Sequence, residues 1–381
     1  MIDRIGKIVQ TVREQEGSSL EALEGRSGVP VFVLAALEGG QRGITTGQLD
    51  DVARALSLDP AALLNGREVR RPVPSVFLRH VAFQDFDVDR DGAVLDDALE
   101  QGRSLGSVQA LLRRPPLALQ ANVFSPREAA ADRPDAPAQD GYQLARTVRA
   151  WLGNVAEPLG DVRILVEERF GVAVVARALE SSRVTAVAVR AATCGAVLLS
   201  SRDVHRARNP LLARVHLSHE LCHVLFDPSP GGLHIIADST SDRKINAAEQ
   251  RARAFAAELL LPLAGLTRLL GSPREVDAPS GARQLVAQAR SRFGAPHELS
   301  ANHLCNHGFI DLRLREWLEA ERTTFDGAPP PTTVPPTGAS SIYLGDLVKQ
   351  AHQDGLLTDG EARETLGIER LAPLPWEEPE L

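Results

Sequence analysis

The spacing of apolar positions divides the chain into helical and β-rich stretches. Residues 4–64 carry apolar side chains at helical intervals in four short runs separated by glycine, proline and threonine, which predicts a small helical bundle. Three valine-rich runs at 172–175, 184–189 and 196–199 predict strands. Longer helical patterns precede and follow these strands. The expected class is therefore α+β: a mostly helical, multidomain chain with a small β-sheet.

Two of the predicted helices carry the candidate chemistry. The apolar run 212–226 contains His219-Glu220-x-x-His223, and histidines four apart lie on the same side of a helix. Two neutral imidazoles so placed can hold one Zn²⁺ per chain, and Glu220 can then act as general base toward water on the metal. Because the segment is strongly apolar, burial of these groups without a metal would be costly.

A zinc site of this kind needs a third protein ligand and one open position. The next helical pattern, 246–261, ends before Pro262 and carries Glu249 near its start. Small residues around Glu249 allow the two helices to approach closely, so we expect Glu249 to be the third ligand. Glu258 is the competitor; otherwise it accepts hydrogen bonds from an N–H group or an arginine and braces the helix pair.

The motif His219-Glu220-x-x-His223, followed by the run from Glu249 to Pro262, resembles the ImmA/IrrE metallopeptidases. The resemblance implies a zincin-like core in which His219, His223 and Glu249 bind zinc and Glu220 is catalytic. It also implies that the substrate is a transcriptional repressor. Some members of the family respond to DNA damage through single-stranded DNA, which makes this a candidate trigger. The chain departs from the family at Cys222, where glycine is usual.

The predicted N-terminal bundle resembles the Xre-type helix-turn-helix in the order and spacing of its helices. A recognition helix needs polar side chains near its start to read bases, but Val31, Phe32 and Val33 stand there. Acidic residues also outnumber basic ones in this segment, which disfavours DNA binding. The alternative is a bundle that serves dimerisation or docks a protein partner.

The domain organisation follows from these patterns and from proline-rich stretches between them. We expect, in order, a helix-turn-helix bundle (1–66), a connecting region with a linker (67–140), a metallopeptidase domain (141–321), a proline-rich linker (322–341) and a helical appendage (342–381). The aspartate-rich segment 87–92 matches half of a calcium loop, but Ala98 stands where the loop needs a glutamate, so a plain turn is expected.

Composition indicates the class of protein and the compartment in which it works. The 381 residues are 43% hydrophobic and 24% charged, with a net charge of −8, which is typical of a globular chain and poor for general nucleic-acid binding. Three irregularly spaced cysteines indicate a reducing cytoplasm rather than a disulfide framework. No apolar run is long enough to span a membrane, and no signal peptide is evident.

Further candidates are weighed against ordinary structural roles. Cys194 precedes a predicted strand, and its thiolate could block the open zinc position; a small buried residue is the simpler interpretation. His234 could contact the substrate oxyanion or be a surface histidine. A basic group before and within the zinc helix could contact single-stranded DNA or simply be solvated; its members are Arg202, Arg206, Arg208 and Arg214.

A second histidine group lies near the end of the peptidase segment. His303 and His307 are four apart, with His297 and Cys305 nearby, which is compatible with a second metal site. No carboxylate stands at a clear ligand spacing from them in the sequence, so a polar, histidine-rich surface is the favoured interpretation.

These observations support two functions. The first is a zinc endopeptidase that cuts a helix-turn-helix repressor to release a stress, mobile-element or phage-defence operon, with single-stranded DNA as a candidate trigger and a homodimer as a candidate assembly. The second is a DNA-binding regulator in which the zinc fold senses rather than cuts. The two differ in whether Glu220 is required.

Overall fold

The computed structural model consists of two compact units, residues 1–75 and 76–381. It describes residues 2–15, 19–41, 43–56, 58, 63–64, 88–124, 136–180, 184–191, 194–201, 209–227, 233–239, 247–273, 276, 278–320, 341–369 and 372–377. Each unit is built around its own apolar core. None of the helices in these ranges is long and apolar enough to cross a membrane.

The first unit is a bundle of short helices, as the apolar spacing predicts. Its helices are α1 (Ile2–Gln15), α2 (Leu20–Ser27), α3 (Val31–Glu38) and α4 (Thr46–Ala55). Ser19 caps α2 by accepting the backbone N–H of Ala22, and Gly28 ends it with a positive φ of 69°. Phe32 on α3 is 75% exposed. DNA reading or protein docking by this bundle stays a prediction.

The second unit contains a mixed four-stranded sheet in the order β1-β3-β2-β4. The strands are β1 (Val172–Arg177), β2 (Val184–Ala191), β3 (Cys194–Ser200) and β4 (Leu233–Ser239). The first three occur where the valine-rich runs predict them. β3 pairs in parallel with β1 and antiparallel with β2, and β4 pairs antiparallel with β2. β4 lies outside the three predicted runs, so this strand was missed at the level of the sequence.

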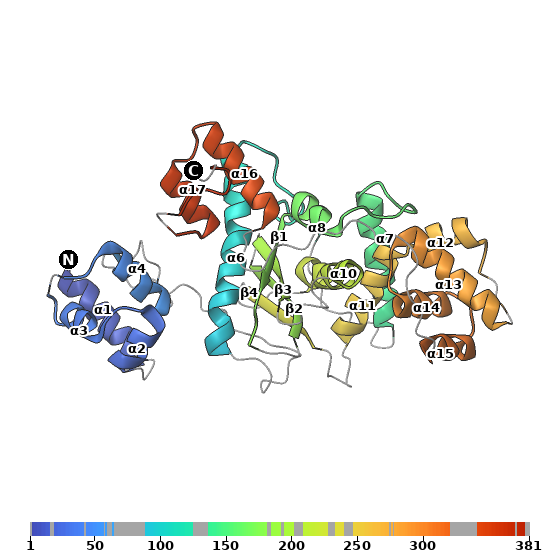
Figure 1. The fold of residues 1–381 in the computed structure, drawn as a ribbon, viewed down its shortest axis with the longest axis horizontal. Coiled ribbons are helices and arrows are strands. Elements are labelled where there is room, and N and C mark those ends of the chain that lie inside the picture. The colour runs from blue at the N-terminus through green and yellow to red at the C-terminus, as the bar shows by residue number, and fades with distance from the viewer. Residues whose placement is uncertain are drawn as a thin grey trace. The chain divides into compact units, whose positions relative to one another are not determined.

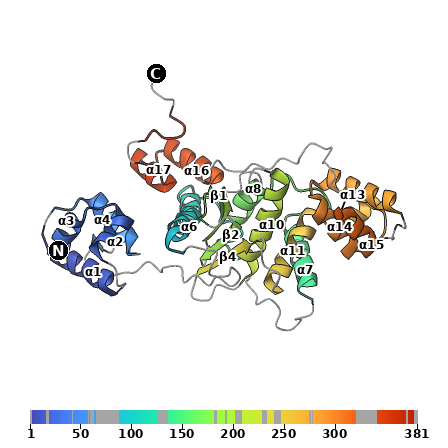
Figure 2. The same ribbon diagram turned by 60° about the horizontal axis from the view of Figure 1, so that its bottom comes forward.

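Helices cover both faces of this sheet because its inner strands are apolar on both sides. Along β3, Ala196 and Leu198 face α6 (Val88–Leu111), whereas Val197 and Leu199 face α10 (Pro210–Phe226). Figures 1 and 2 show the sheet between these two helices. The sheet therefore supports α10, which carries the histidine motif, along its length.

The long helix α6 lies within the predicted connecting region (67–140) and packs on the sheet. Its Leu95 and Leu99 are buried against the strands. The aspartate-rich segment was predicted to be a turn, but residues 88–92 form the start of α6. Asp91 is buried and accepts the backbone N–H of Glu180 at 2.8 Å, so its carboxylate braces the fold.

On the α10 side, α11 (Ala247–Leu260) lies between α10 and α7 (Pro137–Trp151). A glycine makes the close approach of α7 possible: a Cβ atom at Gly141 would stand 2.2 Å from the carbonyl oxygen of Arg251. Before the sheet, α8 (Val162–Leu165) continues into a single π-helical turn, η1 (Val166–Phe170). Ten of the fourteen residues of α11 are buried.

Two helical groups complete the second unit. The first packs around its own apolar cluster after α11 and contains α12 (Leu263–Leu270), α13 (Pro279–Phe293), α14 (His297–Asn306) and α15 (Leu312–Ala320). The second contains α16 (Ile342–Gln353) and α17 (Asp359–Leu366) and packs on α6. The buried carboxylate of Glu167 bonds the Ser341 hydroxyl, so the predicted appendage is joined to the core of this unit.

Candidate metal centre

The histidine motif lies in the middle of α10, whose start is fixed by local sequence. The side chain of Asn209 accepts the backbone N–H groups of Leu211 and Leu212, and Pro210 occupies the first turn, where it needs no N–H partner. His219 and His223 follow one turn apart and are 4% and 2% exposed. Leu217 and Leu221 pack into the core, which holds this helix against the sheet.

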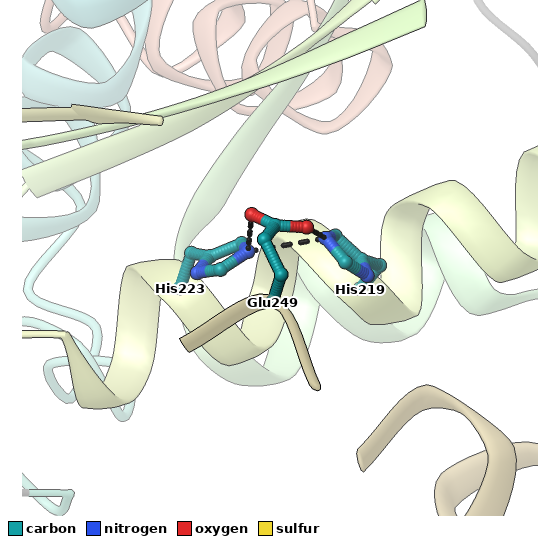
Figure 3. A group of neighbouring side chains, drawn as sticks. All are labelled: His219, His223 and Glu249. Carbon is teal, nitrogen blue, oxygen red and sulfur yellow. Dashed lines mark hydrogen bonds and ion pairs between the residues drawn. The ribbon is translucent and has the colours of Figure 1, made fainter. Parts of the chain in front are cut away.

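Glu249 of α11 reaches both histidines (Figure 3). Its Oε2 lies 3.3 Å from Nε2 of His219, its Oε1 lies 3.4 Å from Nε2 of His223, and the two Nε2 atoms are 3.1 Å apart. Ligand atoms bound about 2.0–2.1 Å from a tetrahedral zinc ion stand about 3.3 Å from one another. The carboxylate reaches each imidazole through a different oxygen, and the three side chains converge closely enough to hold one zinc ion.

The orientation of His223 is fixed by a carboxylate behind it. Asp227, one turn further along the chain, accepts a hydrogen bond from Nδ1 of His223 at 2.9 Å. The other oxygen of Asp227 bonds the guanidinium of Arg251, which lies on α11. With Nδ1 engaged, Nε2 is the ring atom that faces Glu249, and once it has lost its proton its lone pair is available to a metal.

The charges of this group favour ionised Glu249. Burial alone would raise the pKa of Glu249, but hydrogen bonds from His219 and His223 outweigh it and hold that pKa well below its usual range. Burial disfavours the charged form of His223, yet Asp227 and Glu249 raise its pKa well above the ordinary value. Glu249 is therefore an anion at neutral pH, which is the ligand form of a carboxylate.

Comparison with known families agrees with this geometry. Residues 167–305 match the family model of the M78 peptidases, described as the IrrE N-terminal-like domain. That segment is similar to a metallopeptidase domain. The matched residues include His219, Glu220, His223 and Glu249, and the family implies a metal that is generally zinc. A comparison with curated proteins finds no match.

Two further candidates for this site, Glu220 and Glu258, are not among the three converging side chains. Glu220 is fully buried on α10, directly after His219, and its role as general base stays a prediction. Glu258, the competitor of Glu249, lies elsewhere on α11: its Oε1 accepts Arg146 Nε at 2.9 Å and the backbone N–H of Leu263 at 3.2 Å. These are the N–H and arginine partners expected for a bracing carboxylate.

The proposed thiolate latch is wrong for Cys194. Cys194 begins β3 and packs with the cluster on the α6 face of the sheet, opposite the cluster that contains α10. Burial raises the pKa of its thiol, although Arg103 of α6 opposes that shift. Its sulfur would have to cross the sheet to reach His219 or His223. The alternative interpretation was a small buried residue, and Cys194 is partly buried.

The structure also changes the interpretation of the basic group. Arg214 was a candidate DNA contact, but it is fully buried, and its guanidinium donates to the carbonyl oxygens of Gly160 and Leu159. It joins α10 to the loop before α8 and cannot reach nucleic acid. Arg202, Arg206 and Arg208 lie outside the described residues. The backbone of His234 lies in β4, paired with Arg190, but its side chain is likewise outside the described part.

The sequence interpretation did not include Asp227 and Arg251. A carboxylate four residues after His223 lies on the same helix face, and this spacing was a usable signal for the Nδ1 partner. Arg251 had no comparable signal, because its contact with Asp227 depends on how α11 packs against α10. The pair buries opposite charges together, and neither group would be stable there alone.

Changing Asp227 to Asn should weaken zinc binding by about 10–100-fold, because the amide supports His223 less well than a carboxylate does. Competition with a chromogenic chelator would measure the change. Asp346→Asn, on the exposed face of α16, is the matched control and should bind zinc like the unaltered protein. Equal affinities in the two folded variants would contradict the assigned role of Asp227.

Zinc uptake at this centre should release a proton from His223, because its raised pKa leaves the zinc-free imidazole protonated at neutral pH. Affinity should consequently fall as the pH is lowered. Asp227→Asn removes the main cause of the raised pKa, so fewer protons should be released at pH 7. Titration calorimetry in buffers of different ionisation enthalpy counts them. The same proton count in both proteins would show that Asp227 does not set this equilibrium.

Proposed function

We propose that the protein is a zinc-dependent endopeptidase that cuts one specific protein. The observation that carries the proposal is the convergence of His219, His223 and Glu249, whose nitrogen and oxygen atoms lie close enough together to hold one zinc ion. Three protein ligands leave a fourth position for water or substrate, which is the arrangement of a catalytic rather than a structural zinc site. The M78 match supports peptide hydrolysis at this position.

The chain's own residues divide the work at this centre. When bound, zinc supplies Lewis acidity toward water and the scissile carbonyl. Glu220 takes the proton of the attacking water and later donates it to the leaving amine. Asp227 keeps the proton of His223 on Nδ1, so the ring stays a neutral ligand throughout. Burial of all three ligands limits competing solvent around the reacting groups.

The sheet restricts where an extended substrate can add a strand. β3 is hydrogen-bonded on both sides, by β1 and by β2, and has no edge to offer a substrate. Among the described strands, β1 and β4 lie at the edges. β4 lies next to β2, which contacts α10, and we assign substrate pairing to this edge.

We infer that the substrate is a helix-turn-helix repressor whose cleavage releases a stress, mobile-element or phage-defence operon. The ImmA/IrrE resemblance supports this inference, as does an N-terminal bundle with the helix order of an Xre-type domain. Single-stranded DNA is the proposed trigger. The second candidate function, a DNA-binding regulator with a sensory zinc fold, is favoured by the bundle but disfavoured by the apolar start of α3 at Val31–Val33.

The deciding experiment uses the repressor encoded beside this gene and the purified full chain, with and without single-stranded DNA. One cut in the repressor is expected, and Glu220→Gln should lower its rate by at least about 100-fold while zinc remains bound. Glu319→Gln, on the surface of α15, is the control. Cleavage by the Glu220→Gln protein at the original rate would contradict the peptidase proposal. If the operon is still regulated in cells that carry Glu220→Gln, the result would favour the second candidate function, a regulator with a sensory zinc fold.

A further inference from the structure

A second group of histidines and a glutamate lies at the other end of α11. Glu258 comes from the last turn of this helix, and His303 and His307 come from α14 and its C-cap. Glu258 and His303 are 1% exposed, and the side chain of His307 is 11% exposed. The sequence predicted a polar surface for the histidines, and the structure buries them beside a carboxylate instead.

The distances in this group fit the tetrahedral spacing of the first centre. Oε2 of Glu258 lies 3.3 Å from Nε2 of His303 and 3.5 Å from Nε2 of His307. Ligand atoms from all three residues lie within 4.8 Å of one another. Since zinc ligands about 2.0–2.1 Å from the ion are about 3.3 Å apart, one ion fits between these side chains with small adjustments.

The hydrogen bonds around this group leave Oε2 of Glu258 and Nε2 of His307 available to a ligand. Arg146 and the N–H of Leu263 both bond Oε1 of Glu258, so its other oxygen is left for the histidines. Among the described residues, Oε2 of Glu258 and Nε2 of His307 make ion-pair contacts within this group but meet no partner in hydrogen-bond geometry. Buried polar atoms whose hydrogen bonds are incomplete are rare in folded proteins, and such atoms point to an ion or water between them.

The surroundings hold both rings in place. Tyr142 of α7 packs against the imidazoles, with ring centroids 5.4 Å from His303 and 5.0 Å from His307. Its hydroxyl accepts a hydrogen bond from Asn306 at 3.0 Å. Nε2 of His303 also donates to the Leu261 carbonyl at 2.9 Å, so a cation bound there would replace that proton.

We propose that Glu258, His303 and His307 form a second zinc site, which ties α14 to α11. Two imidazoles and one carboxylate are a ligand set that suits Zn²⁺. Leu304 follows the first histidine, so this group has no counterpart of Glu220 and we assign it no step in hydrolysis.

Helix α11 thus presents a carboxylate to each of two histidine pairs. Glu249 and Glu258 are nine residues apart (258 − 249 = 9), about two and a half helical turns, so they face nearly opposite directions. One faces the histidines of α10 and the other those of α14. Metal at the second site joins α12–α15 to the core and stiffens the helix that carries Glu249.

The test counts zinc by mass spectrometry in full-length protein loaded with zinc and dialysed. The unaltered chain should hold two ions, and His303→Gln with His307→Gln should hold one. His219→Ala with His223→Ala should also hold one, and combining all four changes should leave none. In the His219→Ala/His223→Ala protein, a hundredfold excess of zinc over its Kd should raise the thermal midpoint by about 5 °C or more.

Controls separate this proposal from the peptidase proposal and from misfolding. His352→Gln, on α16, should leave the count at two. Circular dichroism must show that each variant is folded, and Glu258→Gln provides a gentler change if the histidine variants unfold. One ion in the unaltered chain and none in folded His219→Ala/His223→Ala protein would overturn the second site. One ion that survives those changes supports it even if no peptidase activity is found.

Discussion

The arrangement of the metal centre depends on one buried carboxylate, that of Asp227. It receives the Nδ1 hydrogen bond of His223 on one oxygen and the guanidinium of Arg251 on the other. It therefore joins α10 to α11 and also selects the tautomer of a metal ligand. Breaking a buried charged pair of this kind costs about 3–5 kcal/mol, so the two helices have little freedom to separate while Asp227 is ionised. The same contact thus positions Glu249 opposite the histidines.

The rest of the second unit makes this helix pair rigid. The sheet supports α10 along its apolar face, and α7 lies against α11 at the contact that Gly141 permits. Arg149 of α7 donates to the carbonyl oxygen of Leu259 at 2.8 Å, which satisfies a carbonyl at the end of α11. Glu249 is consequently held from both sides, and a rigid support is what a metal centre needs to keep its geometry.

Much of this arrangement could be predicted from the sequence because its signals are local. Histidines four apart fix one helix face, and Pro262 marks the end of the next helix. Valine-rich runs locate three strands. The choice of Glu249 over Glu258 also agrees with the structure, where Glu249 lies at the histidines of α10.

What the sequence could not provide are contacts made only by packing. The face of the sheet that Cys194 occupies depends on strand register, and a shift of one residue would reverse it. Arg214 looks like a surface charge until the loop before α8 folds over it. Glu258 has no sequence relation to His303 and His307, and α14 must fold back on α11 to bring them together.

X-ray absorption at the zinc edge tests the central claim most directly, namely that two histidines and Glu249 hold zinc. The measurement is made on zinc-loaded protein carrying His303→Gln and His307→Gln, so that it reports on the first centre. The account predicts two imidazole shells and oxygen ligands at about 2.0–2.2 Å, with no sulfur. Substituting Glu249 should then change only the oxygen contribution. A sulfur ligand at about 2.3 Å, or a spectrum without imidazole scattering, would contradict it.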